Sequence, residues 1–166
     1  MSDEYSRPAT LEDLKSLIRS LNENHVDYLL IGGYALYAHG YHRATTDIDV
    51  LVSSDPESAV RLKRSLMLLP DKAAKDLDLR WFGEGENIRV ADAFVVDIML
   101  NACGQTYETL KPYAEMIDLE GVPVRTINLE GLLLTKRTNR DKDAADRLVL
   151  EKALEVLRRP PSRLDC

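Results

Sequence analysis

Hydrophobic residues recur along this chain with two different periods, and each period predicts its own kind of element. In residues 11–23 the apolar side chains lie three or four positions apart, as on one face of an amphipathic helix. Thr10 and Asp13 form a capping-box pattern at the start of this segment. Residues 28–31 and 48–52 are short apolar runs, which are typical of buried strands. The chain therefore mixes helices and strands.

Turn and capping residues divide the remaining sequence. Pro56 favours a helix start, and Asn128 and Asp141 are suitable caps for the last two helices. The Gly-rich segment 83–86 separates two runs and predicts a hairpin. The expected strands are 28–31, 47–52, 77–82, 88–93, 94–100, 115–119 and 122–127, and the expected helices 11–23, 34–39, 57–69, 106–111, 128–138 and 141–157. This order predicts an α+β (α/β-like) domain in which helices flank a mixed β-sheet.

Length and composition narrow the class of protein. A chain of 166 residues can bury a core of its own, so we expect a single domain over 1–166, with loose tails at 1–8 and 159–166. The net charge of −6 disfavours a broad nucleic-acid-binding surface. Two cysteines are too few for a disulfide framework, and neither a signal peptide nor a membrane-spanning run is visible. We therefore expect a cytoplasmic protein with no membrane partner.

Two aspartates stand inside the apolar run around residue 50. Because strand side chains alternate between faces, Asp47 and Asp49 are expected on one side of the sheet, with Ile48 on the other. Asp97 lies in a later apolar run and would join them if the two strands are neighbours. Clustered carboxylates repel one another unless a cation lies between them, and Mg²⁺ prefers such oxygen ligands. The alternative for each aspartate is a solvated side chain on a half-exposed strand.

A glycine pair precedes the aspartates. Gly32 and Gly33 lie between an expected strand and an expected helix, where the absence of side chains lets backbone N–H groups approach an anion. We interpret the pair as part of a phosphate-binding turn that faces the carboxylates. The alternative is an ordinary tight turn.

Taken together, these features resemble a known family. A Gly-Gly pair, thirteen intervening residues and an Asp-Ile-Asp triplet resemble the signature of the DNA polymerase β-like minimal nucleotidyltransferase superfamily. Residues 127–148 further resemble the C-terminal helices of AbiEii-like nucleotidyltransferases of toxin–antitoxin and abortive-infection systems. The resemblance covers roughly residues 25–150 and implies a polymerase β palm-like nucleotidyltransferase fold.

The resemblance also implies roles for individual residues. Asp47 and Asp49 would hold two Mg²⁺ ions, with Mn²⁺ as a substitute, and Asp97 would bind the ion that activates the acceptor hydroxyl. The phosphates of a nucleoside triphosphate (NTP) would contact Gly32 and Gly33. Members of the family often have Gly-Ser at this place, whereas this chain has Gly32 and Gly33, followed by Tyr34. Because the serine hydroxyl is missing, the phosphate contact must come from backbone N–H groups.

Three basic residues are further candidates for phosphate binding. Arg43 lies just ahead of the aspartates, and Lys136 and Arg140 belong to a basic segment that matches the family pattern. The alternatives are a surface salt bridge for Arg43 and a solvated helix face for Arg137 within the basic segment.

The leading hypothesis is a Mg²⁺-dependent nucleotidyltransferase that moves a nucleoside monophosphate from an NTP to a hydroxyl of a tRNA, a protein or a small molecule. The family resemblance favours a macromolecular acceptor and a cognate toxin or antitoxin partner. A second hypothesis is a nucleotide-binding or partner-binding module of the same fold with little turnover. A sugar transferase that uses Asp-x-Asp is a third, which the glycine pair argues against.

Overall fold

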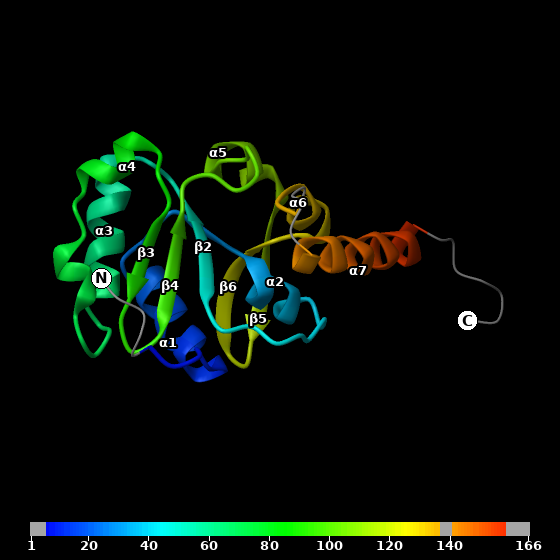
Figure 1. Cartoon of the computed structure of the whole chain (residues 1–166), viewed down its shortest axis with the longest axis horizontal. Coiled ribbons are helices and arrows are strands. Elements are labelled where there is room, and N and C mark those ends of the chain that lie inside the picture. Colours follow the sequence, from blue (N-terminus) through cyan, green and yellow to red (C-terminus); the bar gives the residue numbers. More distant parts are fainter. Residues whose placement is uncertain (1–5, 137–140, 159–166) are drawn as a thin grey trace.

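The computed structural model describes residues 6–136 and 141–158. These residues form one six-stranded mixed sheet in the order β3-β4-β2-β1-β6-β5 (Figure 1). The strand pairs β2–β4 and β1–β6 are parallel, and the other neighbouring pairs are antiparallel. The strands are β1 (Tyr28–Ile31), β2 (Ile48–Val52), β3 (Ile88–Ala91), β4 (Val95–Met99), β5 (Ala114–Leu119) and β6 (Val122–Ile127). The predicted mixed sheet with flanking helices is confirmed.

Two amphipathic helices, α1 (Leu11–Glu23) and α3 (Pro56–Leu66), pack against each other and contribute apolar side chains to the core. The capping box predicted for α1 is present, since Asp13 N donates to Thr10 Oγ1 at 3.2 Å and Thr10 N donates to Asp13 Oδ2 at 2.8 Å. In β2, Ile48 and Val50 are fully buried, as the alternation predicted. This packing fixes which face of the sheet carries the aspartates.

Helix α2 (Gly32–Ala38) follows β1 directly and packs on β1 and β2. Near it, α6 (Leu129–Leu134) contacts both α2 and the long helix α7 (Asp141–Arg158). Figure 1 shows α7 extending away from the sheet, at the opposite end of the molecule from α3 and α4 (Arg80–Glu84). The remaining elements are α5 (Tyr107–Leu110) and two single turns, η1 (Ala73–Asp76) and η2 (Lys111–Tyr113).

The predicted strand at 77–82 is wrong. This segment leads into α4, and β3 pairs with β4 instead, so the hairpin lies one element later than expected. Arg80 N donates to Asp78 Oδ1 at 2.9 Å, which turns the chain, and both Leu77 and Phe82 are 1% exposed. An aspartate-stabilised turn thus allows both apolar residues to reach the core without a strand.

Several element boundaries also differ from the sequence prediction. The glycine pair is the first turn of α2, whereas the helix was expected to begin at residue 34. Helix α3 ends at Leu66 rather than 69, because Pro70 disfavours helical geometry in the residue before it. Helix α6 ends at Leu134 with Thr135 as its C-cap, and the rest of the predicted helix to 138 falls partly outside the described residues. Within the described part of the chain, no helix has the combination of length and apolar character that crossing a bilayer requires.

Candidate active site

The sheet brings two of the predicted carboxylates directly together. In the parallel pair β2–β4, Asp49 lies opposite Asp97. Asp47 lies one residue before β2, and its side chain is 27% exposed, compared with 17% for that of Asp97. Two segments about fifty residues apart in sequence therefore present three carboxylates at one place on the sheet.

The glycine pair is shaped by these neighbours. Gly32 has a φ of +71°, and a Cβ atom there would stand 2.2 Å from Asp49 Oδ2. A Cβ atom on Gly33 would stand 2.6 Å from Thr45 Oγ1. The turn after β1 can approach Asp49 and the segment before β2 this closely only because both residues lack a side chain.

Arg89, which the sequence analysis missed, lies directly opposite Asp97 in the antiparallel pair β3–β4. Its Nε donates to Asp97 Oδ1 at 3.0 Å, and its Nη2 donates to Asp97 Oδ2 at 3.3 Å and to Asp47 Oδ2 at 3.2 Å. One guanidinium therefore bridges two of the three carboxylates. The alternation of Ile88, Arg89 and Val90 was the available signal, but it became informative only once β3 was paired with β4.

The carboxyl of Asp49 has an unusually high pKa. Burial raises the pKa of its carboxyl to about 7, and the charge of Asp97 together with a hydrogen bond to that side chain acts in the same direction. The ammonium group of Lys136 lowers the pKa, and the charge of Asp47 raises it slightly. The site thus holds one carboxyl that a nearby positive charge would drive toward its ionised form.

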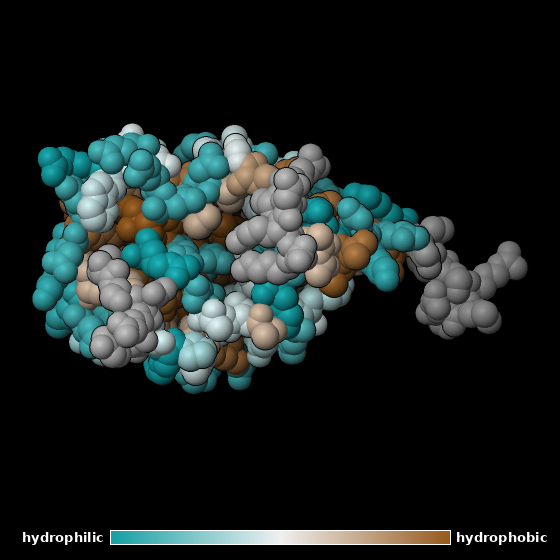
Figure 2. Space-filling view, viewed as in Figure 1, coloured by the Kyte–Doolittle hydropathy of each residue, from teal (hydrophilic) through white to brown (hydrophobic). Residues whose placement is uncertain are grey.

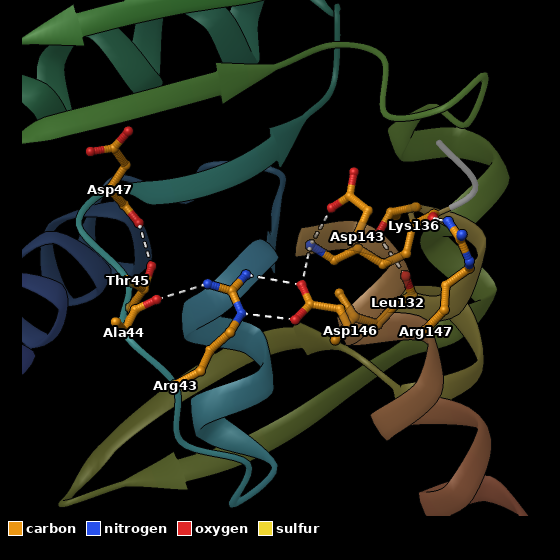
Figure 3. Close-up of polar contacts among 10 residues, drawn as sticks. Arg43, Ala44, Thr45, Asp47, Leu132, Lys136, Asp143, Asp146 and Arg147 are labelled. Atoms are coloured by element: carbon orange, nitrogen blue, oxygen red, sulfur yellow. Dashed lines mark hydrogen bonds and ion pairs between the residues drawn. The ribbon is translucent and has the colours of Figure 1, made fainter. Parts of the chain in front are cut away.

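A second polar cluster joins helix α7 to the segment before β2 (Figure 3). Arg43 Nε and Nη2 donate to the two carboxylate oxygens of Asp146 at 2.9 and 3.0 Å. Lys136 Nζ lies 3.1 Å from Asp146 Oδ2 and 3.4 Å from Asp143 Oδ1. Lys136, Asp143 and Asp146 are at most 5% exposed. We call these four residues the Asp146 cluster.

Both groups of charges border one cavity of about 570 Å³. Figure 2 shows hydrophilic surface in the middle of the face that carries β3 and β4, with hydrophobic surface beside it. The cavity wall includes Gly32, Gly33, Arg43, Thr45, Asp47, Asp49, Asn87, Arg89, Asp97, Asn101 and Lys136. Its volume falls in the range of about 300–1,000 Å³ that is usual for small-molecule sites.

The structure therefore gathers most of the predicted site residues. Gly32, Gly33, Arg43 and Lys136 share the cavity with the three aspartates, whereas Arg140 lies outside the described residues. The described hydrogen bonds of Arg43 go to Asp146 and to the Ala44 carbonyl oxygen, and none of them reaches the three aspartates. Asp146 was missed in the sequence, where it is one of several charges in a helix.

The residues present suit a divalent cation, although they are not yet arranged around one. No group of three His, Cys, Asp or Glu side chains in the described ranges has metal-binding geometry. The bridging guanidinium of Arg89 occupies the space between Asp47 and Asp97. Three carboxylates are nevertheless the oxygen donors that Mg²⁺ and Mn²⁺ prefer, and Arg89 shows that a positive charge fits between two of them.

Comparisons with known proteins support the fold. No protein-family model matches the chain, and no curated protein matches it. A candidate nucleotidyltransferase from Thermotoga maritima superposes with a TM-score of 0.53 at 19% sequence identity, over 89% of each chain. An antigenic nucleotidyltransferase-like protein from Paracoccidioides brasiliensis gives a TM-score of 0.54 at 16% identity, over 95% of this chain and 82% of the other. The chain thus shares the fold of these nucleotidyltransferase-like structures.

Proposed function

We propose that this protein is a nucleotidyltransferase that transfers a nucleoside monophosphate from an NTP to a hydroxyl group of an acceptor and releases pyrophosphate. The observation that supports this proposal most is the convergence of Asp47, Asp49 and Asp97 on one cavity that also contains the glycine pair. The reaction needs charge neutralisation and alignment of the reacting groups, and this cavity offers the residues for both.

Asp47, Asp49 and Asp97 would hold Mg²⁺, in a pair of ions by resemblance to the family, with Mn²⁺ as a substitute. The bound cation would neutralise charge on the phosphates and lower the pKa of the attacking hydroxyl. Asp97, which lies on β4 and borders the cavity, would accept the proton of the acceptor hydroxyl. Asp49 would remain ionised in the working site, because positive charge opposes the effect of burial on its pKa.

The NTP phosphates would lie along the turn after β1 and toward Lys136. Gly32 and Gly33 line the cavity without side chains, so their backbone can approach an anion. Lys136 and Arg43 supply positive charge on the wall of the same cavity, and Arg140 is a further candidate from the resemblance. Arg43 and Lys136 are both paired with Asp146 in the free protein. When the NTP binds, these two cations would therefore shift part of their contacts from the carboxylate to the phosphates.

The acceptor in this proposal is a macromolecule, either a tRNA or a protein, in a toxin–antitoxin or phage-defence setting. This part rests on the AbiEii-like resemblance of residues 127–148. A small-molecule acceptor is the alternative within the same reaction.

The decisive experiment is incubation with labelled NTP, Mg²⁺ and cell extract, followed by detection of label on tRNA, protein and small molecules. Asp47→Ala and Asp49→Ala should abolish transfer. Asp27→Ala is a matched control, because Asp27 lies just before the start of β1, at the end of the strand away from Gly32, and its side chain is 45% exposed. Transfer by the two site variants at the wild-type rate would refute the assignment.

One observation favours a second function, that of a nucleotide-binding module with little turnover. The two described cations expected to bind phosphate, Arg43 and Lys136, are both held by Asp146. Such pairing weakens their attraction for an NTP, because phosphate must compete with a carboxylate for each of them. Calorimetry separates the two functions: NTP binding without pyrophosphate release in the presence of extract would indicate the module.

A further inference from the structure

Arg89 reaches two of the three aspartates, Asp47 and Asp97, from the edge of the sheet. Strand β3 is the terminal strand in the sheet order, and the Arg89 side chain is 51% exposed although it bonds two carboxylates. Its Nη2 alone lies within hydrogen-bond distance of both Asp47 Oδ2 and Asp97 Oδ2. One nitrogen of the delocalised guanidinium cation thus stands between the two carboxylates, where a bridging cation would bind.

We propose that Arg89 is an internal counter-ion of this site, which neutralises Asp47 and Asp97 in the metal-free protein and must withdraw before a divalent cation can bridge them. The inference rests on the proposed function, since it assumes that these aspartates bind a metal. A divalent cation that bridges Asp47 Oδ2 and Asp97 Oδ2 would repel the guanidinium and compete with it for the lone pairs of these two oxygens. Cation binding across these oxygens therefore opposes the Arg89 contacts.

The structure offers a place for the displaced guanidinium. A second cavity of about 270 Å³ is lined by Trp81, Glu86, Asn87, Ile88 and Arg89 itself. Because Asn87 and Arg89 also line the first cavity, the two spaces meet at these residues. A flexible arginine side chain can rotate about its own stem from one to the other, where the lining includes Trp81 and Glu86, an aromatic and an acidic residue of the kinds that attract a cation. Arg89 would then lie between the first cavity, where the NTP is proposed to bind, and the second cavity.

The test is direct measurement of Mn²⁺ binding, by the electron paramagnetic resonance signal of free Mn²⁺, without any turnover. Arg89→Met keeps a flexible, unbranched stem and removes the charged group, so it should bind Mn²⁺ about three- to tenfold more tightly than the wild type. Arg89→Lys keeps a cation and should lie between the two. Arg80→Met is the matched control, because Arg80 forms an equivalent pair with Asp78 outside the cavity and should leave Mn²⁺ affinity unchanged.

The outcomes separate the inference from the proposed function. Equal or weaker Mn²⁺ binding by Arg89→Met, with binding still lost in Asp49→Asn, overturns the role of Arg89 and leaves the metal site in place. Absence of Mn²⁺ binding in every variant overturns both. Should Arg89→Met fail to fold, Arg89→Gln provides the same comparison with a shorter polar side chain, and its Mn²⁺ affinity decides the question.

Discussion

At the scale of single residues, Asp49 carries the highest electrostatic cost in the candidate site. Its carboxyl is buried against Gly32 and faces the charge of Asp97, so its pKa is raised to about 7 from an ordinary 3.8. A folded protein that holds a proton there more tightly than the unfolded chain loses stability as pH rises from about 4 to about 7, and the loss is complete above that range. In the metal-free protein, the contribution of Asp49 to the free energy of unfolding is therefore least favourable at pH 7 and above. A bound cation would oppose this loss most strongly in the same pH range.

This acidity gives the first prediction. In EDTA, Asp49→Asn should raise the free energy of unfolding by up to about 4 kcal/mol at pH 8 and by less than half as much at pH 5, where the folded carboxyl is protonated but the unfolded one is already largely ionised. Urea denaturation at the two pH values measures the difference. The exposed control Asp27→Asn should show no such pH dependence, and an equal effect of Asp49→Asn at both pH values would contradict the argument.

The second prediction concerns Gly32. An alanine there would adopt a φ of +71° and place its Cβ 2.2 Å from Asp49 Oδ2, so Gly32→Ala should lower the free energy of unfolding by about 2–4 kcal/mol. Gly83→Ala is the control, because Gly83 has open space around its Cα and no positive φ. Thermal or urea unfolding compares the two. Similar stabilities for both variants would show that the close approach to Asp49 is not required.

At the scale of elements, helix α7 is connected to the segment before β2 by a buried charge cluster. Asp146, which is 3% exposed, bonds Arg43 from that segment and Lys136 from the residues after α6. The helix otherwise contacts mainly α6, and it extends from the body of the molecule. Asp146 therefore couples the position of α7 to the wall of the cavity through both Arg43 and Lys136, and Asp143 of the same helix also contacts Lys136.

The third prediction tests this coupling. Asp146→Asn leaves the two cations without their shared anion, and loss of one member of a buried ion pair typically costs about 3–5 kcal/mol. Hydrogen exchange should therefore accelerate in α7 and in residues 39–47, and less in β3 and β4. Glu151→Gln, an exposed change on the same helix, should leave the exchange pattern unaltered. Unchanged protection of α7 in Asp146→Asn would rule out the proposed connection.

At the scale of the whole molecule, the cavity joins several separate parts of the chain. Four of them are the glycine pair, the segment with Asp47 and Asp49, Asp97 on β4, and Lys136 after α6. A ligand that contacts all four opposes unfolding of the domain as a unit, since its binding energy is lost when any one of them separates.

The fourth prediction follows from that linkage. An NTP with Mg²⁺, at a concentration about one hundred times its Kd, should stabilise the protein by about 2.7 kcal/mol and raise Tm by about 5–10 °C. Differential scanning fluorimetry of the wild type and of Asp49→Ala measures the effect, which should be much smaller in the variant. If no NTP shifts Tm in the wild type, the cavity does not bind nucleotides.

The sequence by itself determined the class of fold and most of its elements. Each element buries one face or stripe, and the spacing of its apolar residues can be read from neighbouring positions in the chain, so the alternating and helical periods located α1, β1, β2, β4, β5, β6 and α7 correctly. The three aspartates were also recognisable, because charged residues inside apolar strands are uncommon unless they have a partner.

Only the tertiary structure decided which charges meet. The pairing of β3 with β4 brings Arg89 to Asp97, and the packing of α7 brings Asp146 to Arg43. Both pairs depend on contacts between distant segments, and in the sequence each charge has the same local appearance as many solvated ones. The segment 77–82 shows the same limit, since a turn stabilised by Asp78 overrode an apolar alternation that suggested a strand.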